Sequence, residues 1–326
     1  TIKTYIMKKL LKIIPILLLT TLFLQSCDKD DDTIITPVTN NIVDIAQSSE
    51  DFTSLVAALQ KADLVTTLQT EGPFTVLAPT NAAFSTFLLD NGFGSLDEVP
   101  TDILTNVLLN HVISGSVAST DLSTGYTNTL ATSSASNSPM SLFVDTSSGV
   151  RFNGTSSVTT ANISADNGIV HVVDAVIGLP SVVTFAVADP TFSTLVAALT
   201  RDDLTTDFVG VLSTATGTSP APFTVFAPTN DAFGSLLSEL GIAGLADIDE
   251  PTLDAVLKNH VVAGANVLDT DLTDDMTVTT LGGDITANVT GGATLTDSSG
   301  RVSDIIATNI QANNGVIHAI NKVILP

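Results

Sequence analysis

The chain has 326 residues, and its 34 acidic and 11 basic residues give a formal net charge of −23 at pH 7. A chain this acidic lacks the basic footprint that nucleic-acid phosphates require, so we expect no nucleic-acid partner. Its single cysteine excludes an intramolecular disulfide.

Residues 1–26 are predicted to be a signal peptide. Lys8, Lys9 and Lys12 precede an uncharged apolar run over residues 13–24. This run is shorter than the roughly 20 residues that span a bilayer, and its length is typical of a signal-peptide core. Cleavage would remove four lysines and no acids, which leaves 7 basic and 34 acidic residues and a net charge of −27.

The only cysteine, Cys27, directly follows this segment. The sequence Leu-Gln-Ser-Cys resembles a bacterial lipoprotein cleavage box, and the alternative is an incidental cysteine in an ordinary signal peptide. Residues 28–32 read Asp-Lys-Asp-Asp-Asp, which resembles the export signal of surface lipoproteins in Bacteroidetes-type bacteria, or is a solvated acidic linker. We expect residues 27–40 to form a lipidated tether that anchors the protein at the outer membrane or cell surface.

An internal repeat sets the domain organisation. The segment FTVLAPTNAAF at residues 74–84 returns as FTVFAPTNDAF at residues 223–233, with nine of eleven positions identical. An Asn-His-Val motif follows the first phenylalanine of each copy at the same distance, its histidine lying 37 residues on. The sequence therefore predicts two similar domains, at residues 41–180 and 181–326.

Each repeat is predicted to begin with helices and to end with strands. In the first, apolar residues recur at helical spacing from Phe52 to Leu59, and a short strand follows at 74–78. A helix is expected over 100–111, and short strands over 117–165. The dipeptide Asn167-Gly168 then predicts a type I′ hairpin turn.

The second repeat has the same order of elements. We expect a helix with an apolar stripe over 192–199, a strand over 223–227 and a second helix over 251–260. A strand-rich segment over 265–312 and the hairpin dipeptide Asn314-Gly315 follow. In the first repeat Thr80 or Asn81 can cap the helix that follows the Phe-Thr-Val strand, as Thr229 or Asn230 can in the second. This order predicts a sheet layer covered by helices.

These motifs, in this order and twice over, resemble the fasciclin domain. The resemblance implies an α+β fold, mainly β with α, in which each of two β-wedge domains has about seven strands in two sheets with a helical layer. It also implies adhesion to proteins or glycans outside the cell, with no catalytic centre and no cofactor.

The candidate ligand-binding residues come from this resemblance. Animal relatives carry Tyr-His in the internal motif, where this chain has Asn110-His111 and Asn259-His260. They also carry an Asp-Ile pair before the last hairpin, where this chain has Asn162-Ile163 and Asn309-Ile310. The resemblance implies that these positions bind a ligand. The amide in place of the carboxylate argues against integrin-type binding.

The four histidines are His111, His171, His260 and His318, two per repeat. Each pair could bind a metal or serve packing. The usual local ligand pairings of metal sites are absent, so we expect packing and no metal. His111 lies where a helix ends, so its ring can hydrogen-bond a free helix carbonyl.

Neither a calcium site nor a catalytic site is predicted from the remaining motifs. The acidic cluster of Asp269, Asp271, Asp274 and Asp275 lacks the central glycine and late glutamate of a calcium loop, and the first repeat keeps only Asp121. No nucleophile elbow, phosphate loop or dinucleotide motif accompanies the histidines. We therefore expect a non-enzymatic adhesion or ligand-binding lipoprotein. The alternative is a glycan-capturing accessory protein of a polysaccharide uptake system.

Overall fold

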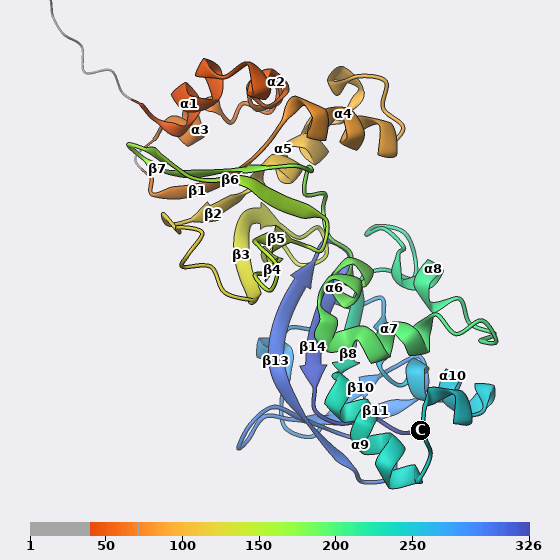
Figure 1. Cartoon of the computed structure of the whole chain (residues 1–326). Coiled ribbons are helices and arrows are strands. Elements are labelled where there is room, and N and C mark those ends of the chain that lie inside the picture. The colour runs from red at the N-terminus through yellow and green to blue at the C-terminus, as the bar shows by residue number, and fades with distance from the viewer. Residues whose placement is uncertain (1–39, 71) are drawn as a thin grey trace, which may run out of the picture. The chain divides into compact units, whose positions relative to one another are not determined.

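The computed structural model describes residues 40–70 and 72–326 (Figure 1). The predicted signal peptide, Cys27 and most of the acidic tether lie outside these residues. The first repeat begins with three helices and a 3-10 turn, α1 (Ile42–Ser48), η1 (Glu50–Phe52), α2 (Thr53–Lys61) and α3 (Val65–Gln69). It continues with β1 (Phe74–Pro79), α4 (Asn81–Asp90), η2 (Leu96–Glu98), α5 (Thr101–Leu109), β2 (Val112–Ser114), β3 (Gly125–Thr132), β4 (Pro139–Asp145), β5 (Arg151–Phe152), β6 (Ser156–Ala165) and β7 (Gly168–Val173).

The second repeat has the same plan. Its first half contains α6 (Val182–Ala188), η3 (Pro190–Phe192), α7 (Ser193–Leu199), α8 (Phe208–Leu212), β8 (Phe223–Pro228), α9 (Asn230–Leu240), η4 (Leu245–Asp247) and α10 (Glu250–Lys258). Its second half contains β9 (Val261–Ala263), η5 (Asp269–Asp271), β10 (Met276–Thr279), β11 (Asp284–Asn288), β12 (Thr294–Thr296), β13 (Val302–Ala312) and β14 (Gly315–Ile320). The helix-first order predicted from the sequence is confirmed in both copies.

The two repeats share one strand order. The seven strands of the first run β2-β1-β7-β6-β5-β4-β3, and those of the second run β9-β8-β14-β13-β12-β11-β10. In each, the Phe-Thr-Val strand pairs in parallel with the last strand, while the other pairings are antiparallel. The predicted α+β fold with seven strands per repeat is confirmed. Two strand layers meet at β6, which pairs with β7 along most of its length and with β5 at its start.

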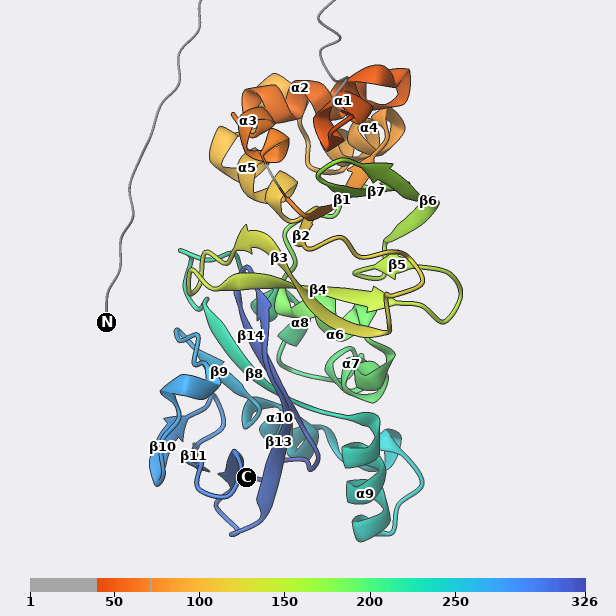
Figure 2. The ribbon, with the colours of Figure 1, turned by 90° about the vertical axis from the view of Figure 1, so that its left-hand side faces the viewer.

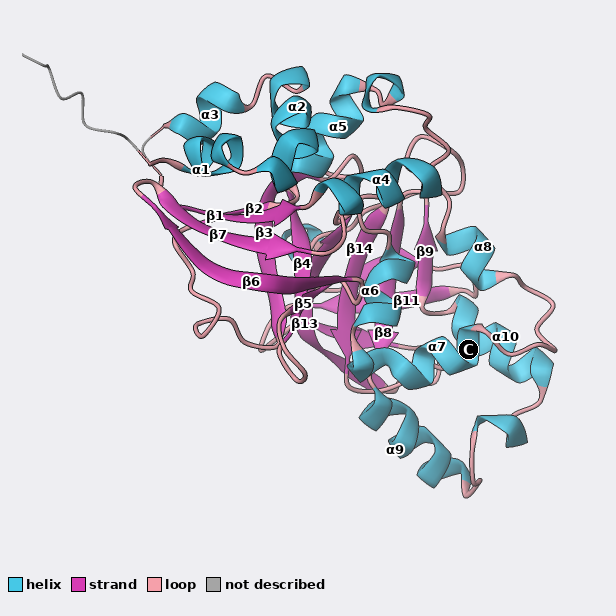
Figure 3. Cartoon of the chain, turned by 45° about the horizontal axis from the view of Figure 1, so that its top comes forward, coloured by secondary structure: helices cyan, strands magenta, loops and turns pink. Residues whose placement is uncertain are grey.

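Helices cover one face of each sheet, and Figure 3 shows α1 to α5 together on one side of β1, β2 and β7. The alternation along β1 divides the apolar core in two. Val76 and Ala78 pack with the helices, while Leu77 packs with the β3–β5 layer on the other face. In a strand successive side chains point to opposite faces, so one six-residue strand serves both cores. Figure 2 shows the corresponding strand β8 beside β14.

The polar residues at the end of the Phe-Thr-Val block stabilise the helices beside it. Thr80 is the N-cap of α4, because its side chain accepts a hydrogen bond from the Ala83 N–H. Asn81 joins this helix to the start of α2, since its Oδ1 accepts from Ser54 N–H at 2.8 Å and its Nδ2 donates to Glu50 carbonyl oxygen. Thr229 and Asn230 make the same contacts in the second repeat.

The hairpin differs from the type I′ turn predicted at Asn-Gly. Ala165 pairs with Gly168, so the two loop residues are Asp166 and Asn167, and neither has a positive φ. Gly168 belongs to the strand instead, where a Cβ would lie 2.0 Å from the Phe74 carbonyl oxygen. The glycine is therefore needed for close approach of the parallel strand rather than for the turn.

The two repeats contact each other along β4 and β13. Ser133 Oγ donates to the Ala312 carbonyl oxygen at 2.6 Å, and Gln311 N–H donates to Ser141 Oγ at 2.9 Å. The Tyr126 hydroxyl donates to the buried Asp189 carboxylate at 3.0 Å. Burial beside this carboxylate raises the pKa of Tyr126.

Within residues 40–70 and 72–326, no single helix is long and apolar enough to cross a membrane, although α6 and the η3–α7 segment reach that length and composition together, across a bend of 94°.

Candidate functional site

The histidines of the internal motif are buried, and each connects a helix to the last segment of its own repeat. His111 follows α5, and its Nδ1 lies 2.8 Å from the Val107 carbonyl oxygen, one turn back. Its Nε2 accepts a hydrogen bond from Ile177 N–H at 2.8 Å, 66 residues further along the chain. An acceptor at Nε2 and a carbonyl at Nδ1 fix the neutral tautomer with the proton on Nδ1. His260 repeats both contacts with Val256 and Ile324.

Burial lowers the pKa of His111 and of His260 to about 4, although the hydrogen bond to the helix carbonyl acts in the opposite direction. Both rings are about 2 % exposed. They are therefore neutral at pH 7, and both nitrogens of each ring are already bonded to backbone groups. The hydrogen bond expected between ring and helix end is present in both repeats.

The second pair of histidines supports a bulge in the neighbouring strand. His171 on β7 is fully buried, its Nδ1 accepts from Asn162 N–H at 3.1 Å, and its Nε2 lies 3.0 Å from the Val117 carbonyl oxygen. His318 on β14 makes the same pair of contacts with Asn309 and Val267. Burial lowers the pKa of His318. These rings carry their proton on Nε2, the tautomer opposite to that of the first pair.

This hydrogen bonding leaves no imidazole lone pair free for a metal or for proton transfer, because each acceptor nitrogen is taken by a backbone N–H. In the part of the chain that the structure describes, no group of three His, Cys, Asp or Glu side chains could hold a metal ion. In the acidic cluster, the carboxylates of Asp269, Asp271 and Asp274 accept hydrogen bonds from neighbouring residues. Hydrogen bonds from Asn309 and Thr308 lower the pKa of Asp269, and those from Thr290 and Val289 lower the pKa of Asp274.

The structure places the eight candidate ligand-binding residues in two environments. Asn110, His111, Asn259, His260 and Ile310 are buried. Asn110 Nδ2 donates to the Gly178 carbonyl oxygen at 3.0 Å, and its Oδ1 accepts from the Thr129 hydroxyl at 3.1 Å. A partner could touch these buried residues only if the core opened.

Asn162, Ile163 and Asn309 lie nearer the surface, at the bulge where the β6–β7 and β13–β14 registers shift. Asn162 is exposed and has a φ of 62°, a left-handed conformation that asparagine tolerates. Its Oδ1 accepts from Ser119 N–H at 2.8 Å and its Nδ2 donates to Ser119 Oγ. In the second repeat Asn309 Nδ2 donates instead to the Asp269 carboxylate at 2.6 Å. The two bulges thus present different polar groups to solvent.

A groove on the first repeat was not predicted. It lies between α4, α5 and the segment after β7, and has a volume of about 550 Å³. Its walls include Phe87, Phe93, Asp90, Asn91 and Asp174. At the corresponding positions the second repeat has Leu236, Ile242, Glu239, Leu240 and Asn321, and Glu239 forms an ion pair with Arg301 at 2.6 Å. A phenylalanine at a helical position such as Phe87 is equally typical of a core residue, so the sequence alone gives no signal for this groove.

The family model of the fasciclin domain matches residues 50–180 and, separately, residues 190–326. The chain belongs to the fasciclin domain family. The shared strand order, the two matching histidine networks and the repeated Phe-Thr-Val block are thus properties of a fasciclin domain present twice. Fasciclin domains are typical of cell adhesion proteins, as in periostin and ig-h3.

Several proteins are similar to one or both fasciclin domains. Protein sll1735 of Synechocystis is 38% identical over 137 residues, which are 42% of this chain and 96% of that protein. Protein sll1483 of the same organism is 36% identical over 136 residues, which are 42% of this chain and 72% of that protein. Human periostin is 28% identical over 262 residues, which are 79% of this chain but only 29% of periostin.

Among solved structures, a FAS1 domain pair from the insect cell adhesion molecule fasciclin I covers 83% of this chain and 92% of its own, with 18% identity and a TM-score of 0.47.

Proposed function

We propose that this protein is a non-enzymatic adhesion or ligand-binding lipoprotein that presents two fasciclin domains outside the cell. One observation carries the proposal: the side chains that recur in both repeats are bonded to the backbone of their own domain. These hydrogen bonds give the recurrent side chains a structural role, which accounts for their presence in both repeats without a reactive centre. Binding then falls to exposed residues, which differ between the two repeats.

Attachment to the membrane rests on Cys27, the only cysteine. Lipidation after removal of residues 1–26 would anchor the protein, while the net charge of −27 that remains keeps its surface away from anionic headgroups. In cells of a Bacteroidetes-type host, Cys27→Ser should shift the protein from the membrane fraction to the soluble fraction. Unchanged membrane association of the Cys27→Ser protein would contradict lipid anchoring.

The exposed bulge of the first repeat is the part of the recurrent motif that a partner can reach. Beads coated with residues 28–326 should clump or retain extracellular proteins or glycans of the host envelope. Asn162→Asp should alter this retention, because it places a carboxylate where the exposed amide now lies. Asn110→Asp is the buried counterpart and should act through stability instead. Retention that follows only the stability of each variant would count against a contact role for the bulge.

Glycan capture is the second candidate, and the groove of the first repeat favours it. Phenylalanine rings beside carboxylate and amide groups suit a sugar, which stacks its apolar face on a ring and hydrogen-bonds through its hydroxyls. A glycan array should show selective binding that is lost in Phe87→Leu, which installs the residue of the second repeat. Leu236→Phe in the second repeat is the matched control and should leave binding unchanged. An array without selective binding would favour protein adhesion.

A further inference from the structure

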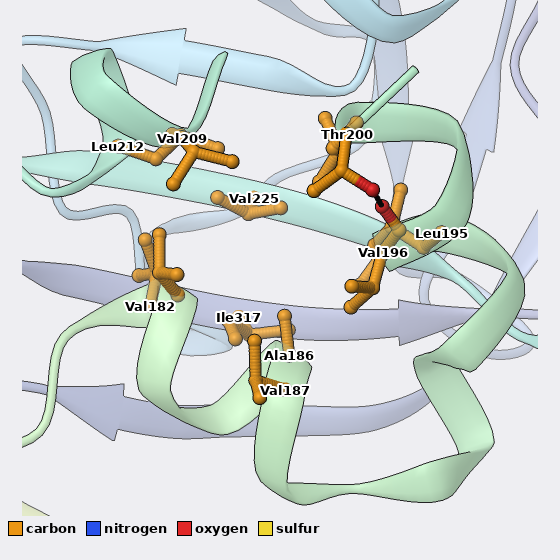
Figure 4. A pocket seen from close by; sticks show the side chains of 13 residues that line it. Val182, Ala186, Val187, Leu195, Val196, Thr200, Val209, Leu212, Val225 and Ile317 are labelled. Atoms are coloured by element: carbon orange, nitrogen blue, oxygen red, sulfur yellow. Dashed lines mark hydrogen bonds between the residues drawn. The ribbon is translucent and has the colours of Figure 1, made fainter. Parts of the chain in front are cut away.

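The second repeat contains an apolar cavity that is larger than the corresponding cavity of the first repeat. The cavity has a volume of about 100 Å³ and lies between α6, α7 and α8 above β8 and β14. Figure 4 shows side chains from these elements, among them Val182, Ala186, Val187 and Leu195, surrounding one space. The corresponding space in the first repeat has a volume of about 20 Å³.

The two sites correspond residue by residue. Val182 N–H donates to the hairpin residue Asn314 and Ile42 N–H donates to Asn167, so Val182 replaces Ile42. In the same way Thr194 corresponds to Ser54, because each donates its N–H to the asparagine of the Phe-Thr-Val block. From these anchors the chain can be aligned along both helices.

Three substitutions enlarge the cavity and make its mouth apolar. Val182 has one methylene fewer than Ile42, and Val187 and Thr200 stand where the first repeat has Gln47 and Gln60. The connection after the helix also differs. Residues 200–207 join α7 to α8, whereas only residues 62–64 join α2 to α3. Leu199 at this edge is half-buried, while its counterpart Leu59 is 4 % exposed.

The lining offers nothing to a polar ligand. Its one hydroxyl, on Thr200, donates to the Val196 carbonyl oxygen at 2.8 Å (Figure 4), which leaves its methyl group for the cavity. Val187 at the mouth is 66 % exposed, and Val209 is 37 % exposed. Apolar cavities of about this size stay dry and bind small hydrocarbons. The exposed valines extend the apolar surface beyond the cavity itself.

The charged residues next to the cavity mouth limit which charge the polar head group of an apolar ligand can carry. Asp202, Asp203 and Asp207 follow the lining residues of α7 and are exposed. The neighbouring Arg201 is fully hydrogen-bonded within the protein. Its Nη1 donates to the Leu245 and Ile248 carbonyl oxygens, and its Nε and Nη2 donate to the Asp203 carboxylate. Among these residues, a ligand with an anionic head group would face carboxylates and would find no cationic side chain available to pair with it.

We propose that this cavity binds the end of an unbranched hydrocarbon chain with a neutral or cationic head. The site belongs to the second repeat alone. It is separate from the groove of the first repeat, because the two share no lining residue.

Titration of the full chain with alkanols tests the proposal. The Cys27→Ser variant is used, so that the protein carries no lipid of its own. From 1-hexanol to 1-decanol, calorimetry should show one saturable site whose affinity rises about fourfold per methylene, the factor that ~0.8 kcal/mol gives, until the cavity is full. Decyltrimethylammonium should bind at least as well as decanol, and decanoate should bind more weakly.

Two variants locate the site. Ala186→Leu fills the cavity and should abolish binding, and Val182→Ile together with Val187→Gln installs first-repeat residues and should weaken it at least about fourfold. Ala46→Leu, the matched change in the first repeat, should leave binding unchanged. Unfolding midpoints confirm that each variant is folded. Absence of saturable binding, equal binding by Ala186→Leu, or binding of a leucine-bearing peptide but not of alkanols would overturn the proposal.

Discussion

Individual side chains of the recurrent motifs act by bonding to backbone groups far away in the chain. Asn167 illustrates this: its Nδ2 donates to the Leu68 and Thr70 carbonyl oxygens, and its Oδ1 accepts from Ile42 N–H at 3.0 Å. One amide thus holds the hairpin, the start of α1 and the end of α3 together. Asn314 makes the same three kinds of contact in the second repeat and is only 3 % exposed.

Asn314→Ala is expected to lower the free energy of unfolding by about 2–4 kcal/mol, because it leaves one buried N–H and two carbonyl oxygens without this partner. Urea unfolding measures the change. Asn313→Ala alters the neighbouring loop residue and is expected to have a smaller effect. Equal effects of the two substitutions would contradict the role given to Asn314.

The buried histidines predict a loss of stability in mild acid. His111 and His260 have a pKa of about 4 in the folded state, against 6.5 when exposed. Between these values the unfolded state binds a proton that the folded state does not, so protonation favours unfolding. The stabilisation is fully present above pH 6.5 and is lost as the pH falls towards 4. From pH 7 to pH 5 we expect a loss of about 2 kcal/mol per histidine.

Urea unfolding at pH 7 and pH 5 tests this prediction. Replacing His260 with Gln should destabilise the protein at pH 7 and make its stability less dependent on pH over this range. An unchanged pH dependence in that variant would show that His260 titrates normally in the folded protein.

At the scale of elements, a glycine sets how closely the last strand approaches the Phe-Thr-Val strand. A Cβ on Gly168 would lie 2.0 Å from the Phe74 carbonyl oxygen, and one on Gly315 would lie 2.3 Å from that of Phe223. Backbone atoms of a central strand cannot move away without breaking their own hydrogen bonds. The parallel pairs β1–β7 and β8–β14 therefore depend on these glycines.

Gly315→Ala should lower the free energy of unfolding by about 3 kcal/mol or more, since overpacking against a backbone is relieved only by moving the strand. Gly234→Ala is the control, because it lies in α9 and a Cβ there meets nothing within 4 Å. Helix propensity predicts a gain of about 0.5–1 kcal/mol for it. A mild effect of Gly315→Ala in thermal unfolding would contradict the close approach.

The elements were largely predictable, and the contacts between them were not. The helix expected over 100–111 is α5 (Thr101–Leu109), and the repeat fixed the alignment of the two domains. The Asn-Gly dipeptide was read as a turn because its true constraint, the Phe74 carbonyl, lies 94 residues earlier in the chain. The partner of His111 Nε2 and the apolar cavity likewise depend on tertiary packing, which local pattern does not encode.

At the scale of the whole molecule, the described repeats share a polar and aromatic contact. Tyr126 of β3 packs its ring against Phe143 and Phe185, with centroids 5.1 and 5.5 Å away, while its hydroxyl donates to Asp189. Phe143 belongs to the first repeat but packs in the main apolar core of the second. The two domains are therefore expected to unfold together.

Tyr126→Phe should lower the free energy of unfolding by about 1–3 kcal/mol, because Asp189 loses a buried donor while the ring contacts remain. Tyr126→Ala removes the rings' contacts as well and should separate the thermal transition into two. Calorimetry measures both. A single transition of unchanged width in Tyr126→Ala would contradict coupling through this residue.

Both nitrogens of each imidazole face backbone groups of the protein itself. Nitrogen-15 NMR of histidine-labelled protein at pH 7, recorded with and without equimolar Zn²⁺, tests this most directly. We predict that His111 and His260 are neutral with the proton on Nδ1, that His171 and His318 carry a proton on Nε2, and that none of the four signals changes when zinc is added. Titration of His111 or His260 near pH 6.5, or zinc-induced shifts of any histidine signal, would contradict it.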